Sequence, residues 1–186
     1  FPTKNKPKPR FLIQTLHLSG ITPHNYSFKA TIKNITLEHS LIKQPTHITF
    51  LAQNDRNTTF EFKGSYDTRL DQNTLNGSYQ LSHYRLSPTT LLSRISLPNP
   101  TLSILGAITI QHSELNSTST LEFSNLNPAP LSSSEDLFTS ILIDTLTNQE
   151  SLPVTVLLTG PILTPKPSIS SPIDTQLNTQ FKEQTD

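Results

Sequence analysis

Apolar and polar residues alternate along most of the chain between Phe11 and Phe123. This is the period of a β-strand that turns one face toward a core. The alternating segments are separated by short polar turns, such as 54–56 and 71–73. Because these turns are too short for helical crossovers, neighbouring strands should pair antiparallel. The pattern therefore predicts a mainly β fold with an antiparallel meander sheet.

Two kinds of irregularity interrupt the alternation. The apolar phase slips by one residue at Lys33 and Asn34, which predicts a β-bulge. Glycines stand on the apolar phase of three strands, at Gly64, Gly77 and Gly106. Since a strand glycine marks a bend or a close backbone approach, the sheet is expected to be curved. The alternative is that each of the three glycines is a separate adjustment to local packing and that they do not indicate a curved sheet.

The last third of the chain predicts one or two short amphipathic helices. Apolar residues at helical spacing follow an acidic, Ser-rich start and predict a helix at about 134–148. The alternation then returns and predicts a last strand at about 152–160. Beyond two prolines, Ser171 as N-cap and Pro172 at the first helical position predict a C-terminal helix at about 172–184.

Composition indicates a single β-rich domain over residues 11–186. Residues 1–10 carry four basic side chains between prolines and are expected to form a basic, Pro-rich tether. Leu, Ile, Val and Phe make up 53 of 186 residues, which is enough to build a core. The 26 Thr and 22 Ser residues fit the solvent-facing side of a sheet.

Charge and cysteine content exclude several classes of function. The formal net charge is zero, and beyond the tether no basic cluster suggests a nucleic-acid partner. Without cysteine there can be no disulfide framework and no thiolate metal site. No apolar run approaches the ~20 residues of a membrane-spanning helix. Any membrane anchor is therefore expected to lie outside this sequence.

The chain lacks the usual signatures of catalysis. Its six histidines form no metal-ligand spacing, and no Gly-x-Ser-x-Gly nucleophile elbow occurs. Acidic residues such as Glu61 and Glu122 alternate opposite to the apolar positions, as solvated charges do. We therefore expect no enzyme, no cofactor and no metal site, and enzymatic activity remains only a residual hypothesis.

The apolar phase of the strands is the remaining candidate site. If the sheet is curved and only partly covered, its inner face would form a groove for acyl chains. The alternative is an ordinary packed core, which sequence cannot distinguish from a lipid-filled one. The candidate groove residues are Phe28, Ile32, Ile48, Phe50, Phe60, Phe62, Tyr79, Leu81, Ile104, Ile108 and Ile110.

The segment from Leu152 to Asp174 resembles the closing segment of AsmA-like proteins of the Gram-negative envelope. In those proteins an apolar strand ends in glycine, a Pro-flanked extended piece follows, and a Ser/Asp-initiated helix closes the segment. The residues that carry this resemblance are Val154, Val156, Leu158, Gly160, Pro165, Pro167, Ile169, Ser171 and Asp174.

This resemblance implies a periplasmic, β-rich domain of a protein anchored in the inner membrane. It implies a role in lipid transport or envelope homeostasis through a hydrophobic groove, with phospholipid or another acyl-chain ligand as partner. It provides no catalytic residues. The alternative is a structural or protein-interaction β module, an accessory subunit of an envelope or surface complex whose partners would be other envelope proteins.

Overall fold

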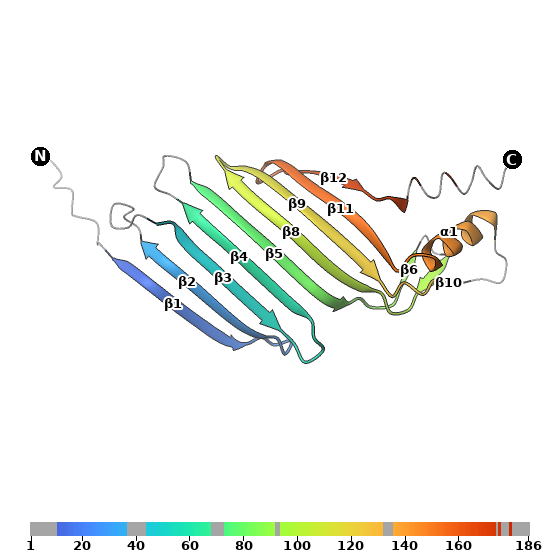
Figure 1. Ribbon diagram of the computed structural model, residues 1–186, viewed down its shortest axis with the longest axis horizontal. Helices are drawn as coiled ribbons and strands as arrows, with labels where there is room; N and C mark the ends of the chain where they lie inside the picture. The colour runs from blue at the N-terminus through green and yellow to red at the C-terminus, as the bar shows by residue number, and fades with distance from the viewer. Residues whose placement is uncertain are drawn as a thin grey trace, which may run out of the picture.

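The computed structural model shows two antiparallel sheets and one helix (Figure 1). The larger sheet has nine strands and the smaller one three. The prediction of a mainly β fold with an antiparallel meander is confirmed. The residues that the structure describes are 11–36, 44–67, 73–91, 94–131, 136–173, 175 and 179.

In the large sheet, every strand pairs antiparallel with its neighbours. The sheet is open, with β1 at one edge and β12 at the other. The β8–β9 hairpin turns through His112 and Ser113, both at positive φ, as a tight two-residue hairpin requires. In spatial order the strands are β1 (Leu12–Ile21), β2 (Ser27–Thr36), β3 (Thr46–Gln53), β4 (Thr59–Asp67), β5 (Thr74–Arg85), β8 (Thr101–Gln111), β9 (Glu114–Ser124), β11 (Ser151–Pro161) and β12 (Lys166–Ser170).

The small sheet and the helix come from two insertions into the meander. The first insertion separates β5 from β8 and forms β6 (Thr89–Leu91) and β7 (Ile95–Leu97). The second separates β9 from β11 and forms β10 (Ala129–Pro130) and α1 (Leu137–Thr147). β10, β7 and β6 pair in that order. Both insertions lie at the same end of the large sheet (Figure 1).

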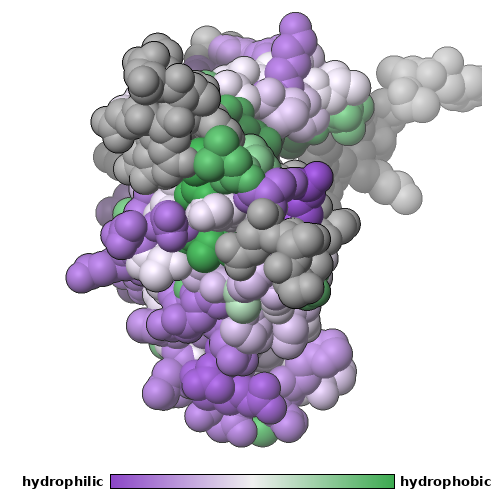
Figure 2. Space-filling model, turned by 90° about the vertical axis from the view of Figure 1, so that its right-hand side faces the viewer, coloured by the Kyte–Doolittle hydropathy of each residue, from purple (hydrophilic) through white to green (hydrophobic). Residues whose placement is uncertain are grey.

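The tightest packing in the described part of the chain lies between these insertions. A buried cluster of five residues joins the small sheet to α1. Phe123 of β9 and Leu152 of β11 pack against it, so the cluster also fixes this end of the large sheet. Figure 2 looks at the molecule from this side and shows apolar side chains gathered among hydrophilic ones. The buried cluster consists of Ile95, Leu97, Leu126, Leu142 and Leu146.

The helix predicted at 134–148 is confirmed as α1, and its N-cap is Asp136. The Thr139 backbone N–H donates to Asp136 Oδ1 over 2.8 Å, which satisfies one of the free donors of the first turn. Asp136 has an extended backbone and therefore stands outside the helix. We expected acidic residues in the first turn of the helix, but the acidic residue is the N-cap, Asp136.

The predicted last strand is β11, and the Pro-flanked piece after it forms the edge strand β12. At the start of the predicted C-terminal helix, the Ile173 N–H donates to Ser171 Oγ over 3.4 Å, as expected for an N-cap. Most of that helix, about 172–184, lies outside the described residues, and so does the tether at 1–10. Ile173 itself packs against the buried cluster.

The irregularity predicted at Lys33 and Asn34 takes the form of a left-handed residue in β2. At Asn34 the backbone has a φ of 62°, yet the β1–β2 register keeps the same offset from Ile32 to Ile35. The alternation of apolar and polar side chains therefore shifts at Asn34, whose backbone is left-handed, while the pairing of β1 with β2 keeps its register. A register shift does occur between β5 and β8, from Leu81 to Tyr84.

Candidate functional site

The eleven candidate groove residues all lie on one face of the nine-stranded sheet, which we call the apolar face. In an antiparallel pair, opposed residues share a face, and so do residues two apart on one strand. The register therefore places the candidates in successive rows across β2, β3, β4, β5 and β8. Phe28, Phe60, Leu81 and Ile104 form one row, Phe50, Phe62 and Tyr79 the next, Ile32, Ile48 and Ile108 the third, and Ile110 lies beyond it.

None of these eleven side chains is fully buried or fully exposed. Ala52 is the only apolar residue of the large sheet that is buried among those described. Every other described strand belongs to the small sheet, and α1 packs on that sheet. Within the described part of the chain, no second layer of secondary structure lies across the apolar face. Its side chains are shielded by their neighbours on the sheet.

Aromatic rings cover three glycines of the apolar face. The Phe62 ring lies so close to Gly64 and Gly77 that a Cβ at either position would be 2.8 Å from it. The Tyr79 ring lies over Gly106, where a Cβ would be 2.4 Å from Cζ. The glycines are therefore required for close approach of the rings.

Two serines interrupt the apolar face on β9. Ser117 and Ser119 are buried, and both hydroxyls hydrogen-bond with the Tyr79 hydroxyl, which is 3.3 Å from Ser117 Oγ. Ser117 Oγ also donates to the Ala107 carbonyl oxygen over 3.0 Å. These bonds satisfy polar groups that would otherwise be unfavourable on an apolar surface. The serines were not predicted, because nothing in the sequence pairs them with Tyr79.

The apolar face continues onto two strands beyond the candidates. Leu121 of β9 pairs with Ile104, and Val154 of β11 pairs with Leu121. Val156 follows on the same face of β11. The alternation at 152–158 identifies an apolar strand, but no sequence signal places it beside β9. The apolar face therefore includes more strands than the sequence predicted.

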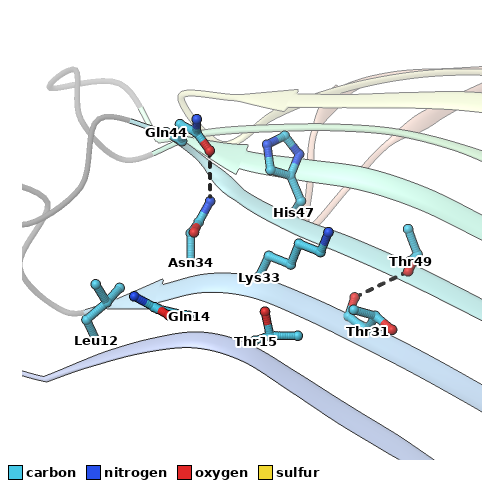
Figure 3. A pocket seen from close by; sticks show the side chains of 9 residues that line it. All are labelled: Leu12, Gln14, Thr15, Thr31, Lys33, Asn34, Gln44, His47 and Thr49. Atoms are coloured by element: carbon cyan, nitrogen blue, oxygen red, sulfur yellow. Dashed lines mark hydrogen bonds between the residues drawn. The ribbon is translucent and has the colours of Figure 1, made fainter.

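The opposite face of the large sheet carries mainly Thr, Ser and charged side chains. A hollow of about 590 Å³ opens on it near the β1 edge (Figure 3). Lys33 and His47 are its basic groups. The hollow is lined by Leu12, Gln14, Thr15, Thr31, Lys33, Asn34, Gln44, His47 and Thr49.

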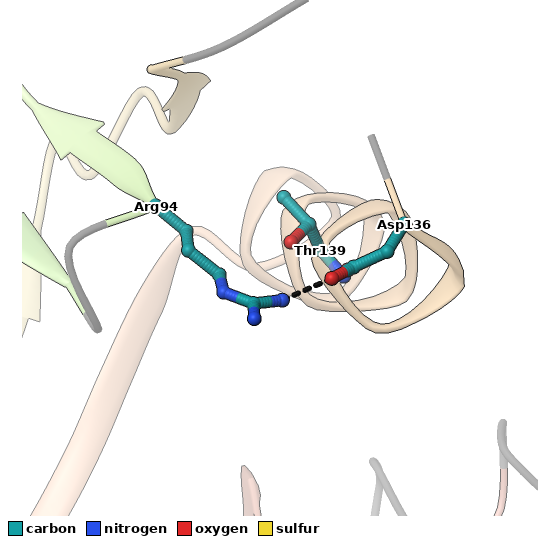
Figure 4. A network of polar contacts seen from close by, with 3 residues as sticks. All are labelled: Arg94, Asp136 and Thr139. Atoms are coloured by element: carbon teal, nitrogen blue, oxygen red, sulfur yellow. Dashed lines mark hydrogen bonds and ion pairs between the residues drawn. The ribbon is translucent and has the colours of Figure 1, made fainter. Parts of the chain in front are cut away.

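The polar network at the start of α1 is structural. Arg94, just before β7, forms an ion pair with Asp136, the N-cap of α1 (Figure 4). The hydrogen bonds from Thr139 and the guanidinium of Arg94 hold the pKa of the Asp136 carboxyl below its ordinary value. The ion pair links the small sheet to the helix.

Acid should therefore destabilise the small sheet and α1. Because the pKa of Asp136 is lower in the folded state, its stabilising effect is complete above the ordinary carboxyl pKa and is lost as pH falls through the lowered value. We expect the melting temperature of Asp136→Asn to fall less over this acidic range than that of the wild type, since asparagine keeps the cap without the charge. Melting curves by circular dichroism from neutral to acidic pH test this. Parallel losses in both proteins would contradict it.

Within the described ranges, no group of three His, Asp or Glu side chains comes together as a metal site would require. None of the helical segments described there is long and apolar enough to span a membrane. No family model matches the chain, and neither a curated protein nor a solved structure matches it. The AsmA-like resemblance therefore stays a hypothesis that rests on the residues named above.

Proposed function

We propose that this chain is a non-enzymatic domain of the cell envelope that binds or conducts lipid along the apolar face. The observation that supports this is an apolar surface across the large sheet with no described layer of secondary structure over it. Strands lie ~4.8 Å apart, so nine strands span about 38 Å. A soluble protein rarely leaves a contiguous apolar patch of more than a few hundred Å² in water. Acyl chains are suitable occupants, because they require no hydrogen-bond partners.

The chemistry of the two faces supports an aqueous compartment around the domain. The Thr- and Ser-rich face suits water, while the apolar face offers a path from strand to strand across the sheet. The AsmA-like resemblance favours the periplasm as this compartment, with an inner-membrane anchor outside this sequence. We propose phospholipid as the ligand class and other envelope proteins as neighbours.

Replacement of one side chain in the middle of the apolar face tests the proposal. Ile108 lies on this face in β8, and Ala107, next to it, points to the opposite face. We expect native mass spectrometry of the purified wild type to show bound phospholipid. Ile108→Asp should lose it, because a carboxylate is costly beside acyl chains. Ala107→Asp should retain it.

The circular dichroism spectra of both variants show whether the sheet remains folded. Phe62→Asp, on the next row of the apolar face, provides a second variant if Ile108→Asp does not fold. A well-folded wild type that carries no lipid in detergent-free buffer would contradict the proposal. So would equal lipid retention by the Ile108→Asp and Ala107→Asp variants.

A protein-interaction module is the second candidate, and the edge of the sheet supports it. β1 is an edge strand of ten residues without proline, lysine or acidic side chains. Such an edge can pair with a strand from another chain. β12, at the other edge, is five residues long and contains Lys166 and Pro167. A folded domain without lipid that forms complexes through β1 would favour this candidate.

A further inference from the structure

Two hollows share a pair of arginines at the end of the large sheet where β1 joins β2 and β3 joins β4. One has a volume of about 350 Å³ and the other of about 620 Å³. Arg56, in the β3–β4 turn, and Arg85, at the end of β5, line both of them. The two arginines therefore border the same space.

These arginines are available to a ligand. Among the described residues, the ion pairs join Lys63 with Glu61 and Arg94 with Asp136, and neither Arg56 nor Arg85 takes part in one. Asp55 is the only carboxylate that lines the smaller hollow, and the larger one has none. The remaining polar walls are mainly neutral hydrogen-bonding groups, with His24 as a further basic side chain. The local charge is positive and favours an anion.

Hydrogen bonds hold the backbone at or beside both arginines. Asn54 Oδ1 accepts from the N–H of Arg56 over 2.9 Å and from that of Thr58 over 3.0 Å, which holds the β3–β4 turn. The residue after Arg85, Leu86, donates its N–H to the Pro100 carbonyl oxygen over 2.9 Å. The side chains thus project from an ordered backbone at the sheet end.

The smaller hollow adjoins the apolar face. The register shift in β5 pairs Tyr84 with Leu102, two residues before Ile104, and so places Tyr84 on the apolar face. Tyr84 lines the hollow together with Tyr26, which precedes Phe28 by two residues. Tyrosine is well suited to this position, because its ring is apolar and its hydroxyl is polar. A molecule on the apolar face could therefore extend its polar end toward the arginines.

We propose that Arg56 and Arg85 bind a phosphate group, the headgroup of a lipid whose acyl chains lie on the apolar face. Guanidinium groups match phosphate oxygens in geometry and charge and can donate two hydrogen bonds each. The inference rests on the proposed function and adds a headgroup preference to it. It also predicts how the lipid is oriented, with its headgroup at the end of the sheet that carries the β1–β2 and β3–β4 turns.

Two lipids that differ only in the phosphate provide the test. Phosphatidic acid and diacylglycerol with the same short acyl chains are titrated into the wild-type protein, and binding is followed by native mass spectrometry. We expect the wild type to prefer phosphatidic acid about tenfold, the effect of charge-assisted hydrogen bonds at a partly exposed site. The double variant Arg56→Gln/Arg85→Gln should bind both lipids equally.

A double variant on the opposite face controls for the change in net charge. Lys29 and Lys33 lie on the polar face of β2, and Lys29→Gln/Lys33→Gln removes the same charge as the arginine variant. It should keep the preference for phosphatidic acid. Equal binding of both lipids by the wild type would overturn the headgroup site and leave the proposed function intact. If the arginine variant still preferred phosphatidic acid, the headgroup site would also be overturned.

Inorganic phosphate separates the two possible sources of the ligand. If the wild type binds neither lipid, the proposed function fails, and titration with inorganic phosphate decides the inference alone. Calorimetric binding of phosphate that is lost in Arg56→Gln/Arg85→Gln would support a site for free phosphate. An absence of phosphate binding in this case would overturn the site.

Discussion

Leu142→Ala is expected to lower the free energy of unfolding by about 3 kcal/mol, one of the two largest effects predicted for this chain. Leu142 is 3% exposed and belongs to the buried cluster between α1 and the small sheet. Truncation would leave a cavity that the surrounding side chains can close only in part. Urea unfolding followed by circular dichroism measures the loss.

Leu105→Ala is the matched control. Leu105 lies on the opposite face of β8 and is 62% exposed, so the same truncation there should change the free energy of unfolding by less than about 0.5 kcal/mol. If Leu142→Ala cost no more than Leu105→Ala, the cluster would not be the packed core that the structure shows.

Gly106→Val is expected to destabilise the protein by about 2 kcal/mol. A Cβ at this position would lie 2.4 Å from Tyr79 Cζ, so the ring would have to move. Its displacement would break the hydrogen bonds of the Tyr79 hydroxyl with Ser117 and Ser119, and both serines would remain buried without that partner. Chemical denaturation measures the effect.

Two further variants separate the steric overlap from a general effect of valine. Ala107→Val adds bulk at the next residue, on the exposed face, where a β-branched side chain is well tolerated. It should have little effect on stability. In the background Tyr79→Ala, Gly106→Val should cost much less than in the wild type, because the overlapping ring is absent. An additive double variant would contradict the proposed contact.

Much of the large sheet was predictable because the strand period is visible in the sequence. The eleven candidates alternate regularly, and since each short turn joins antiparallel neighbours, their placement on one face follows from local information. The helix was predictable because the helical spacing of its apolar residues is also visible in the sequence. Its cap at Asp136 was less so, because Ser133, Ser134 and Glu135 offer competing starts.

Other features depend on contacts between distant segments. β6, β7 and β10 have only two or three residues each, too few for a period to be recognised. The hydrogen bonds of Tyr79 with Ser117 and Ser119 join residues about 40 positions apart in the chain. Whether a second layer covers the apolar face is likewise a property of the assembled fold. The same alternation of apolar and polar residues is found in a strand that faces a packed core and in a strand whose apolar face is uncovered.

The meander also determines how this fold can change in size. Each interior strand of the large sheet has its main contacts with the two strands beside it. Insertion or deletion of a hairpin among β1–β4 would therefore widen or narrow the sheet while leaving the packing around α1 unchanged. Evolution could adjust the width one hairpin at a time, as it adjusts the length of a repeat protein.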